Sequence, residues 1–171
     1  MDIKSNIISV LVSAFSKEVS IIFIAALPVF ELRLAIPLAI IKFNLSWPNA
    51  YCFSLLGNLL PVIPLLLFFK FFFHKLENVR FAGRFFQWWF KRVEKKAAII
   101  RKWGFWGLVC FVAIPLPVTG AWTGTVAATL LEMNIKKAFS AIVIGVSFAG
   151  IIVTILSVLV PGVIKQWFIF T

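Results

Sequence analysis

The sequence predicts an all-α integral membrane protein made of two inverted repeats, each a broken, re-entrant helical hairpin followed by a transmembrane helix. Three observations support this prediction. Of the 171 residues, 62% are hydrophobic and only 13% are charged, far from the roughly 25% charged residues of a soluble domain. Long uncharged stretches exceed the ~20 apolar residues that span a bilayer. Short motifs also recur in the second half of the chain.

The recurring motifs indicate an internal duplication. Leu-Pro-Val at 27–29 recurs at 116–118, and Gly57 recurs as Gly145. We therefore expect a single membrane domain over residues 1–171. It comprises an amphipathic helix at 1–17, a first repeat at 19–73, a basic amphipathic linker helix at 74–102 and a second repeat at 103–164.

The first repeat opens with a broken apolar segment. From Val19 to Ile41 the only charged residues are Glu31 and Arg33, and the prolines at 28 and 37 each remove a backbone donor. Since no uncharged piece is long enough to span, we expect two half-helices that meet around 28–37 inside the membrane. A full crossing of this segment would instead give a four-span bundle with parallel halves, and hydropathy does not separate the two arrangements.

The next stretch, Phe43 to Phe69, is uncharged and long enough to span. Trp47 and Tyr51 near its start are typical of interfacial anchors. Asn58 is its one strongly polar residue. It has two interpretations, an interhelical hydrogen bond or a substrate contact.

The linker combines basic and apolar faces. If residues 74–102 are helical, Arg84, Lys91, Lys95 and Lys102 align opposite an apolar face, which is typical of a helix lying in the membrane plane. The positive-inside rule places it in the cytoplasm, where it would bind anionic lipid head groups. Because the basic residues lie beside apolar runs, we do not expect nucleic-acid binding despite the net charge of +11.

The second repeat has a broken segment at 114–124 and a last span from Ala138 to Ile164. The broken segment contains no charge, but its hydroxyls and glycine N–H groups could contact a substrate or simply pack closely. Its candidate site residues are Pro117, Thr119, Gly120, Trp122 and Gly124. Between break and span, the i,i+4 spacing of Glu132 and Lys136 predicts an ion pair.

The residues with the clearest chemical potential are Glu31 and Arg33. A charge in a membrane segment costs at least ~2.5–3.5 kcal/mol and usually has a function or a partner. Two residues apart, they diverge on a regular helix but project to one side of an extended loop. Glu31 could then exchange a proton while Arg33 contacts a phosphate or carboxylate. Alternatively, the two form a static pair that holds the loop.

Other kinds of chemistry have little support in the sequence. We find no nucleophile–base pair, metal-ligand cluster or phosphate-binding loop, and Cys52 and Cys110 each stand alone. We therefore do not expect an enzyme, a metal or a cofactor.

Two motifs resemble a known family. Glu31-Leu-Arg33-x-Ala-Ile-Pro37, followed by a long Asn- and Pro-containing span, and Ile114-Pro-Leu-Pro117-x-Thr-Gly120-x-Trp-x-Gly124 are similar to those of the small multidrug export proteins. That family is similar in turn to the DedA superfamily of SNARE-associated, or VTT-domain, proteins. DedA proteins carry arginines in the second motif, and residues 114–125 have none.

The resemblance implies two inverted hairpin-plus-span repeats and a multi-pass transporter of the plasma membrane, in which a homo-oligomer is possible. It implies proton-coupled export or flipping of a small amphiphile or lipid-linked phosphate. By this resemblance Glu31 would be the titrating acid and Arg33 a head-group contact. Pro37 and Asn58 are the other candidate site residues of the first repeat. Two alternatives remain: a non-transporting scaffold that binds lipid or a partner through its basic helix, and a four-span drug antiporter.

Overall fold

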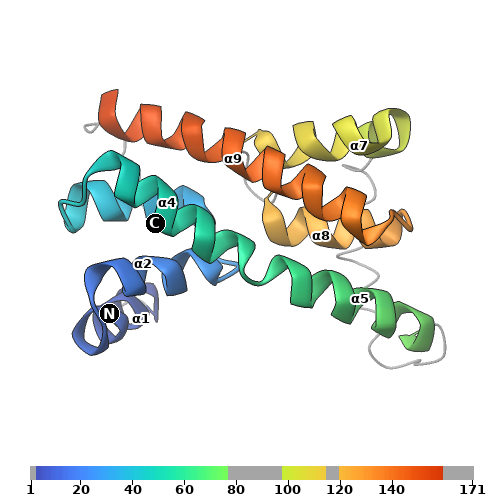
Figure 1. The fold of residues 1–171 in the computed structure, drawn as a ribbon. Helices are drawn as coiled ribbons and strands as arrows, with labels where there is room; N and C mark the ends of the chain where they lie inside the picture. Colours follow the sequence, from blue (N-terminus) through green and yellow to red (C-terminus); the bar gives the residue numbers. More distant parts are fainter. Residues whose placement is uncertain (1–2, 77–97, 115–119, 160–171) are drawn as a thin grey trace. The chain divides into compact units, whose positions relative to one another are not determined.

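The computed structural model describes residues 3–76, 98–114 and 120–159, and all regular elements in these ranges are helices (Figure 1). The all-α prediction is therefore confirmed for the described residues. The chain divides into two compact units. Met1–Leu60 with Ser147–Thr171 form the first, and Pro61–Val146 form the second.

The first unit is built around a helical hairpin. It contains α1 (Ile3–Ala14), α2 (Lys17–Ala26), α3 (Glu31–Pro37), the π-helix η1 (Leu38–Lys42), α4 (Trp47–Leu59) and the part of α9 (Ile135–Leu159) that starts at Ser147. Helix α1 covers most of the stretch expected to be amphipathic. Three of its apolar residues, Ile8, Leu11 and Val12, pack against the core of this unit.

Capping and a tight turn define the hairpin. Ser16 caps α2 by accepting a hydrogen bond from the Val19 N–H at 3.4 Å. After Ala26 the chain turns at Leu27–Phe30, where Pro28 cannot continue the backbone ladder. The Glu31 N–H donates to the Leu27 carbonyl at 3.0 Å and closes the turn.

The predicted break at Pro37 is wrong. Only 27–30 forms a turn, and Glu31–Pro37 is helical with the proline inside the helix. The chain then continues directly into η1, in which the Phe43 N–H bonds to the Leu38 carbonyl five residues back. Proline lacks the donor that the α-helical ladder requires. The chain nevertheless stays helical through Pro37 and continues into η1.

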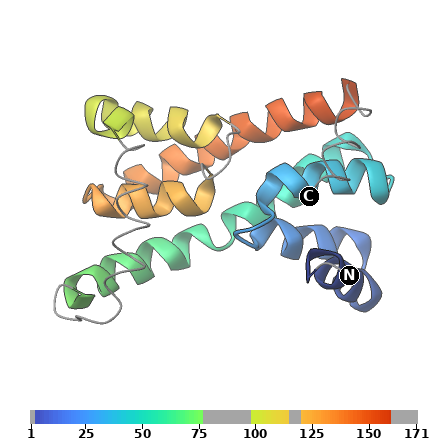
Figure 2. The ribbon, with the colours of Figure 1, turned by 180° about the vertical axis from the view of Figure 1, so that it is seen from behind.

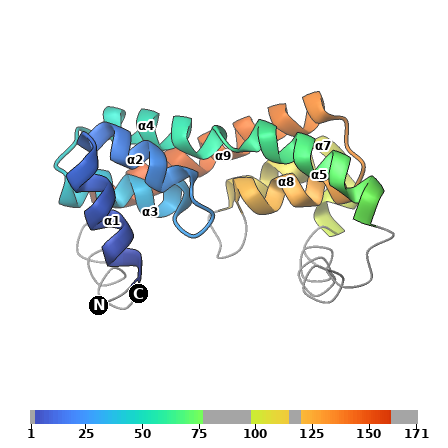
Figure 3. The same ribbon diagram turned by 90° about the horizontal axis from the view of Figure 1, so that it is seen from below.

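Helices α2 and α3 both pack against α4, around a core of small and branched apolar side chains (Figures 1 and 3). Gly57 makes the closest approach. A Cβ on this residue would overlap the Ile22 carbonyl oxygen and lie 2.9 Å from the Ala25 methyl. The C-terminal ends of α2 and α4 therefore meet beside the turn of the hairpin.

This contact leads to a prediction on folding. Replacing Gly57 by Val should destabilise the protein by about 1–3 kcal/mol or more, because the α2 backbone must move to admit the side chain. Thermal unfolding in detergent would measure the effect. Cys52→Ala, on an exposed position of the same helix, is the matched control. Equal melting temperatures for the two variants would show that α2 and α4 do not pack as described.

The second unit repeats this pattern. It contains α5 (Val62–Leu76), α7 (Ala98–Ala113), α8 (Ala121–Leu130) and the part of α9 that ends at Val146. Gly104 kinks α7 with φ 53° and ψ −119°, a conformation that only glycine readily adopts. A Cβ on Gly145 would lie 2.9 Å from the Val109 carbonyl oxygen, so α9 approaches α7 as α4 approaches α2 (Figure 2).

Several features of the first half of the chain recur 88 residues later in the second half. Helix α4 starts at Trp47 and α9 starts at Ile135, 88 residues later. The residues with a left-handed backbone just before them, Asn44 and Glu132, have the same separation. Gly57 and Gly145 are again 88 residues apart and serve the same close helix contact. These correspondences support the duplication inferred from the sequence.

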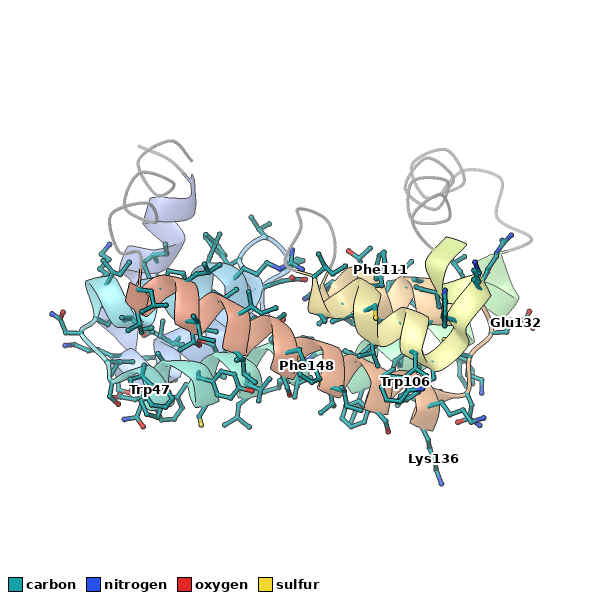
Figure 4. All side chains as sticks on the ribbon, turned by 90° about the horizontal axis from the view of Figure 1, so that it is seen from above. Trp47, Trp106, Phe111, Glu132, Lys136 and Phe148 are labelled. Atoms are coloured by element: carbon teal, nitrogen blue, oxygen red, sulfur yellow. The ribbon has the colours of Figure 1, made fainter. Side chains whose placement is uncertain are left out.

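The predicted ion pair between Glu132 and Lys136 does not form. Both side chains are exposed, and they point in different directions (Figure 4). The rule for i,i+4 pairs applies within one helix. Here Glu132 has φ 52° and lies before α9, which begins at Ile135.

Tyr51, the second residue expected to be an interfacial anchor, also contacts another helix. Its hydroxyl donates to the Ser147 carbonyl at 3.3 Å, and its ring contacts α9 at Gly150. Trp47, by contrast, is 60% exposed at the start of α4 (Figure 4), as an anchor would be. Tyr51 instead joins α4 to the second half of α9 within the first unit.

Two described helical segments are long and apolar enough to cross a membrane, Trp47–Phe71 and Ile135–Leu159, each of 25 residues. Both expose large apolar side chains along one face. On α9 this face includes Phe148 (Figure 4), Ile151, Ile152, Ile155 and Leu156. A contiguous exposed apolar face of this kind is suited to contact with lipid.

Candidate transport site

The first unit places a carboxylate in an apolar interior at the turn of the hairpin. Glu31 is the first residue of α3 and only 8% exposed. Its φ of 48° lies in the left-handed region, which costs a non-glycine residue about 1–2 kcal/mol. Strained, buried residues cluster at functional sites because the surrounding structure must hold them there. Glu31 is therefore the leading candidate for chemistry in the described chain.

Arg33 follows two residues later and is partly buried. The Glu31 carboxylate is close enough to attract its guanidinium. On a regular helix the two side chains would diverge, but the left-handed backbone of Glu31 departs from regular geometry. The acid and the base therefore interact electrostatically, but the extended loop expected to bring them together is absent, because both residues belong to α3.

Leu32, between the two charged residues, is 2% exposed and packs close to Tyr51 on the inner side of α9 at Gly150. This contact fixes the start of α3 against the rest of the unit. Pro37 is also buried, at the end of α3, six residues from Glu31. Its role in the described structure is to join α3 to the π-helix.

Asn58 lies on the buried face of α4, in the same unit. It is fully buried, as is Ser54 one turn earlier. In the described part of the chain, the Asn58 Oδ1 and Nδ2 and the Ser54 Oγ have no hydrogen-bond partner. The interhelical hydrogen bond considered for Asn58 is therefore not found among these residues. Ser54 is not among the residues predicted for the site; its i,i+4 spacing from Asn58 indicates only that the two lie on one face of α4.

The second motif belongs to the other unit. Gly120, Trp122 and Gly124 lie at or near the start of α8, whereas Pro117 and Thr119 lie outside the described residues. A Cβ on Gly124 would lie 2.6 Å from a Val112 methyl, so this glycine permits close packing of α8 on α7. Gly124 thus has the packing role that was one of the two interpretations.

The predicted site residues consequently fall into two groups. Glu31, Arg33, Pro37 and Asn58 belong to the first unit, and the described residues of the second motif belong to the second unit. That the two motifs meet in one site stays a prediction.

Of the linker cations, Arg84, Lys91 and Lys95 lie outside the described residues. Lys102 is exposed at the start of α7, with its ammonium 6.0 Å from the Trp103 ring centre.

Comparison with known proteins identifies one family. A family model described as "Putative small multi-drug export protein" matches residues 31–152. The match begins at Glu31, includes both motifs and covers more than half of the chain. No curated protein matches the chain, and no solved structure does.

Proposed function

Because the chain belongs to the family of putative small multi-drug export proteins, we propose that this membrane protein exports small cationic amphiphiles in exchange for protons at Glu31. The observation that most supports this proposal is the burial of the Glu31 carboxylate at a strained backbone position beside Arg33. A membrane-embedded acid is expensive to keep and is usually functional.

Coupling to the proton gradient follows from competition at one carboxylate. Without substrate, Arg33 attracts the ionised Glu31. A proton or a cationic amphiphile can each neutralise this carboxylate, and they exclude one another. If the Glu31 carboxylate is open to one side of the membrane at a time and binds either a proton or the cation, the two move in opposite directions. Proton entry then drives export of the cation.

An anionic substrate such as a lipid-linked phosphate would behave differently. It would bind the Arg33 fork and leave Glu31 to take up a proton. Substrate and proton would then move in the same direction, and an inward proton gradient would oppose export. The direction of coupling therefore distinguishes the two substrate classes.

Element lengths support a re-entrant hairpin. Helix α2 has 10 residues, and α3 with η1 has 7 and 5. At 1.5 Å per residue these measure about 15 Å and 18 Å, roughly half of the ~30 Å hydrocarbon core. In the other half of the chain α8 also has 10 residues and α7 is kinked. We propose that both hairpins enter and return on the same side.

With one span after each hairpin, the two halves would have opposite orientations in the membrane. This is the inverted-repeat arrangement of many transporters, whose sites lie at interrupted helices. A DedA-like relationship would have the same architecture. The four-span alternative needs residues 19–41 to cross, and the short helices of this segment argue against it.

Ethidium transport tests the proposal directly. Purified protein is reconstituted into vesicles with an acidic interior, and ethidium fluorescence is followed in neutral medium. Antiport predicts accumulation inside the vesicles, which stops when nigericin and potassium collapse the pH gradient. Protein-free vesicles are the control. Accumulation only with an alkaline interior would indicate co-transport, and no difference from protein-free vesicles would contradict the proposed function.

A further inference from the structure

Ser54 and Asn58 form the one pair of fully buried, unpartnered polar side chains on neighbouring turns in the described chain. They are four residues apart on α4, so their Cβ atoms are about 6 Å apart on one helix face. Ala50 and Gly57 are buried on the same face. Gly57 contacts α2 close to the hairpin turn, so the pair lies on the side of α4 that faces the hairpin.

Other buried hydroxyls in the first unit find partners within their own helices. Thr154 donates to the Gly150 carbonyl at 2.7 Å, and Ser157 donates to the Val153 carbonyl at 2.7 Å. This bond to the residue four positions back is the usual solution for a helical hydroxyl. Ser54 does not use it. Its hydroxyl is therefore available to a group outside α4.

The other half of the chain shows that the fold does not require polarity here. Counting 88 residues from Ser54 and Asn58 gives Ile142 and Val146, which are fully buried. Ile142 lies beside α8 at Gly124. The same helix face is thus filled by apolar side chains in one unit and by two polar side chains in the other. Keeping an unpaired buried polar group costs about 1–3 kcal/mol, which indicates a function.

We propose that Ser54 and Asn58 form a subsite that binds a neutral hydroxyl or amide group of the exported amphiphile. The chemistry follows from the three unpartnered atoms. Asn58 Nδ2 donates, Asn58 Oδ1 accepts, and the Ser54 hydroxyl does both. The Nδ2 hydrogens would repel a cation, and the Oδ1 oxygen would repel an anion. A neutral group that both donates and accepts hydrogen bonds therefore fits best. This inference rests on the proposed function and adds a specificity element to it.

The corresponding residues of the other unit, Ile142 and Val146, suggest which side chains to introduce. The test variants are therefore Asn58→Val and the double variant Ser54→Ile with Asn58→Val. Melting temperatures in detergent should rise in both, because an apolar side chain replaces an unpaired polar one. Thr154→Val, which removes a hydroxyl that already has a partner, is the control and should lower the melting temperature. A lower melting temperature for Asn58→Val would mean that Asn58 is bonded within the protein, and would overturn the inference.

Selectivity is the second readout. Two inhibitors of ethidium transport are compared, dodecyltrimethylammonium and its analogue with one N-methyl replaced by hydroxyethyl. The hydroxylated probe should inhibit the wild type at a concentration about 2–10-fold lower, the effect of one hydrogen bond, and the difference should disappear in Asn58→Val. Equal inhibition in the wild type, or a difference that persists in Asn58→Val, would overturn the inference. Failure of the proposed function would look different, since the wild type would then not transport ethidium.

Discussion

Replacing Glu31 by Gln should abolish proton-driven ethidium transport while leaving the protein folded. The amide has the same shape and occupies the same 8% exposed position, but it cannot bind or release a proton in this pH range. We expect at least a 100-fold lower initial rate, in line with the larger effects of losing an essential acid–base group. Fluorescence assays with an acidic vesicle interior would measure it.

The matched control for this substitution is Glu132→Gln. Glu132 is also a glutamate with a left-handed backbone, φ 52°, but its side chain is exposed. Transport by this variant should equal that of the wild type. If Glu31→Gln retained the pH dependence of the wild type, Glu31 could not be the coupling residue.

Removing the positive charge beside Glu31 should give the second large effect. Arg33→Gln leaves the buried carboxylate without the guanidinium that attracts it, and breaking a buried charge pair costs about 3–5 kcal/mol. Since Arg33 is only partly buried, we expect about 2 kcal/mol, measured by thermal unfolding in detergent.

A double-mutant cycle separates this interaction from other effects of Arg33. Glu31→Gln in the Arg33→Gln background removes the unpaired charge, so the double variant should be more stable than Arg33→Gln alone. Strict additivity of the two single effects would show that Glu31 and Arg33 do not interact, and the competition mechanism would lose its basis.

Hydrophobicity and charge placement predicted much of this fold. The stretch after Phe43 and the stretch after Ala138 are apolar over more than 20 residues, and both correspond to long helical segments. Gly57 and Gly145, which recur at a spacing of 88 residues, each permit a close helix contact. Such signals survive in a sequence because membrane burial and close helix contacts each allow few residue types.

Features that depend on backbone geometry were not predictable in the same way. Pro37 is a residue type that usually breaks helices, yet it lies inside α3 and is followed directly by the π-helix η1. The spacing of Glu31 and Arg33 argues against proximity on a regular helix, but the left-handed φ of Glu31 makes the start of α3 irregular. Neither the π-turn nor the left-handed residue has a sequence signal as strong as glycine or asparagine would give.

Ser54 was not predictable from the sequence for a different reason. Serine is common in helices because its hydroxyl bonds to the backbone of its own helix, so a single serine in an apolar span attracts little attention. Only the atomic structure shows that this hydroxyl has no partner in the described chain, next to an amide in the same condition.

The most direct test of the central claim, a re-entrant first hairpin that holds Glu31 within the membrane, is the sidedness of three exposed positions. Ser16 precedes α2, Ser46 precedes α4 and Asn134 precedes α9. Each is replaced by cysteine in a protein lacking Cys52 and Cys110, and intact cells are labelled with an impermeant maleimide. Re-entrant hairpins predict that Ser16→Cys and Ser46→Cys react from outside and that Asn134→Cys is protected. Protection of Ser16→Cys together with labelling of Asn134→Cys would mean that both segments cross fully, and would contradict the account.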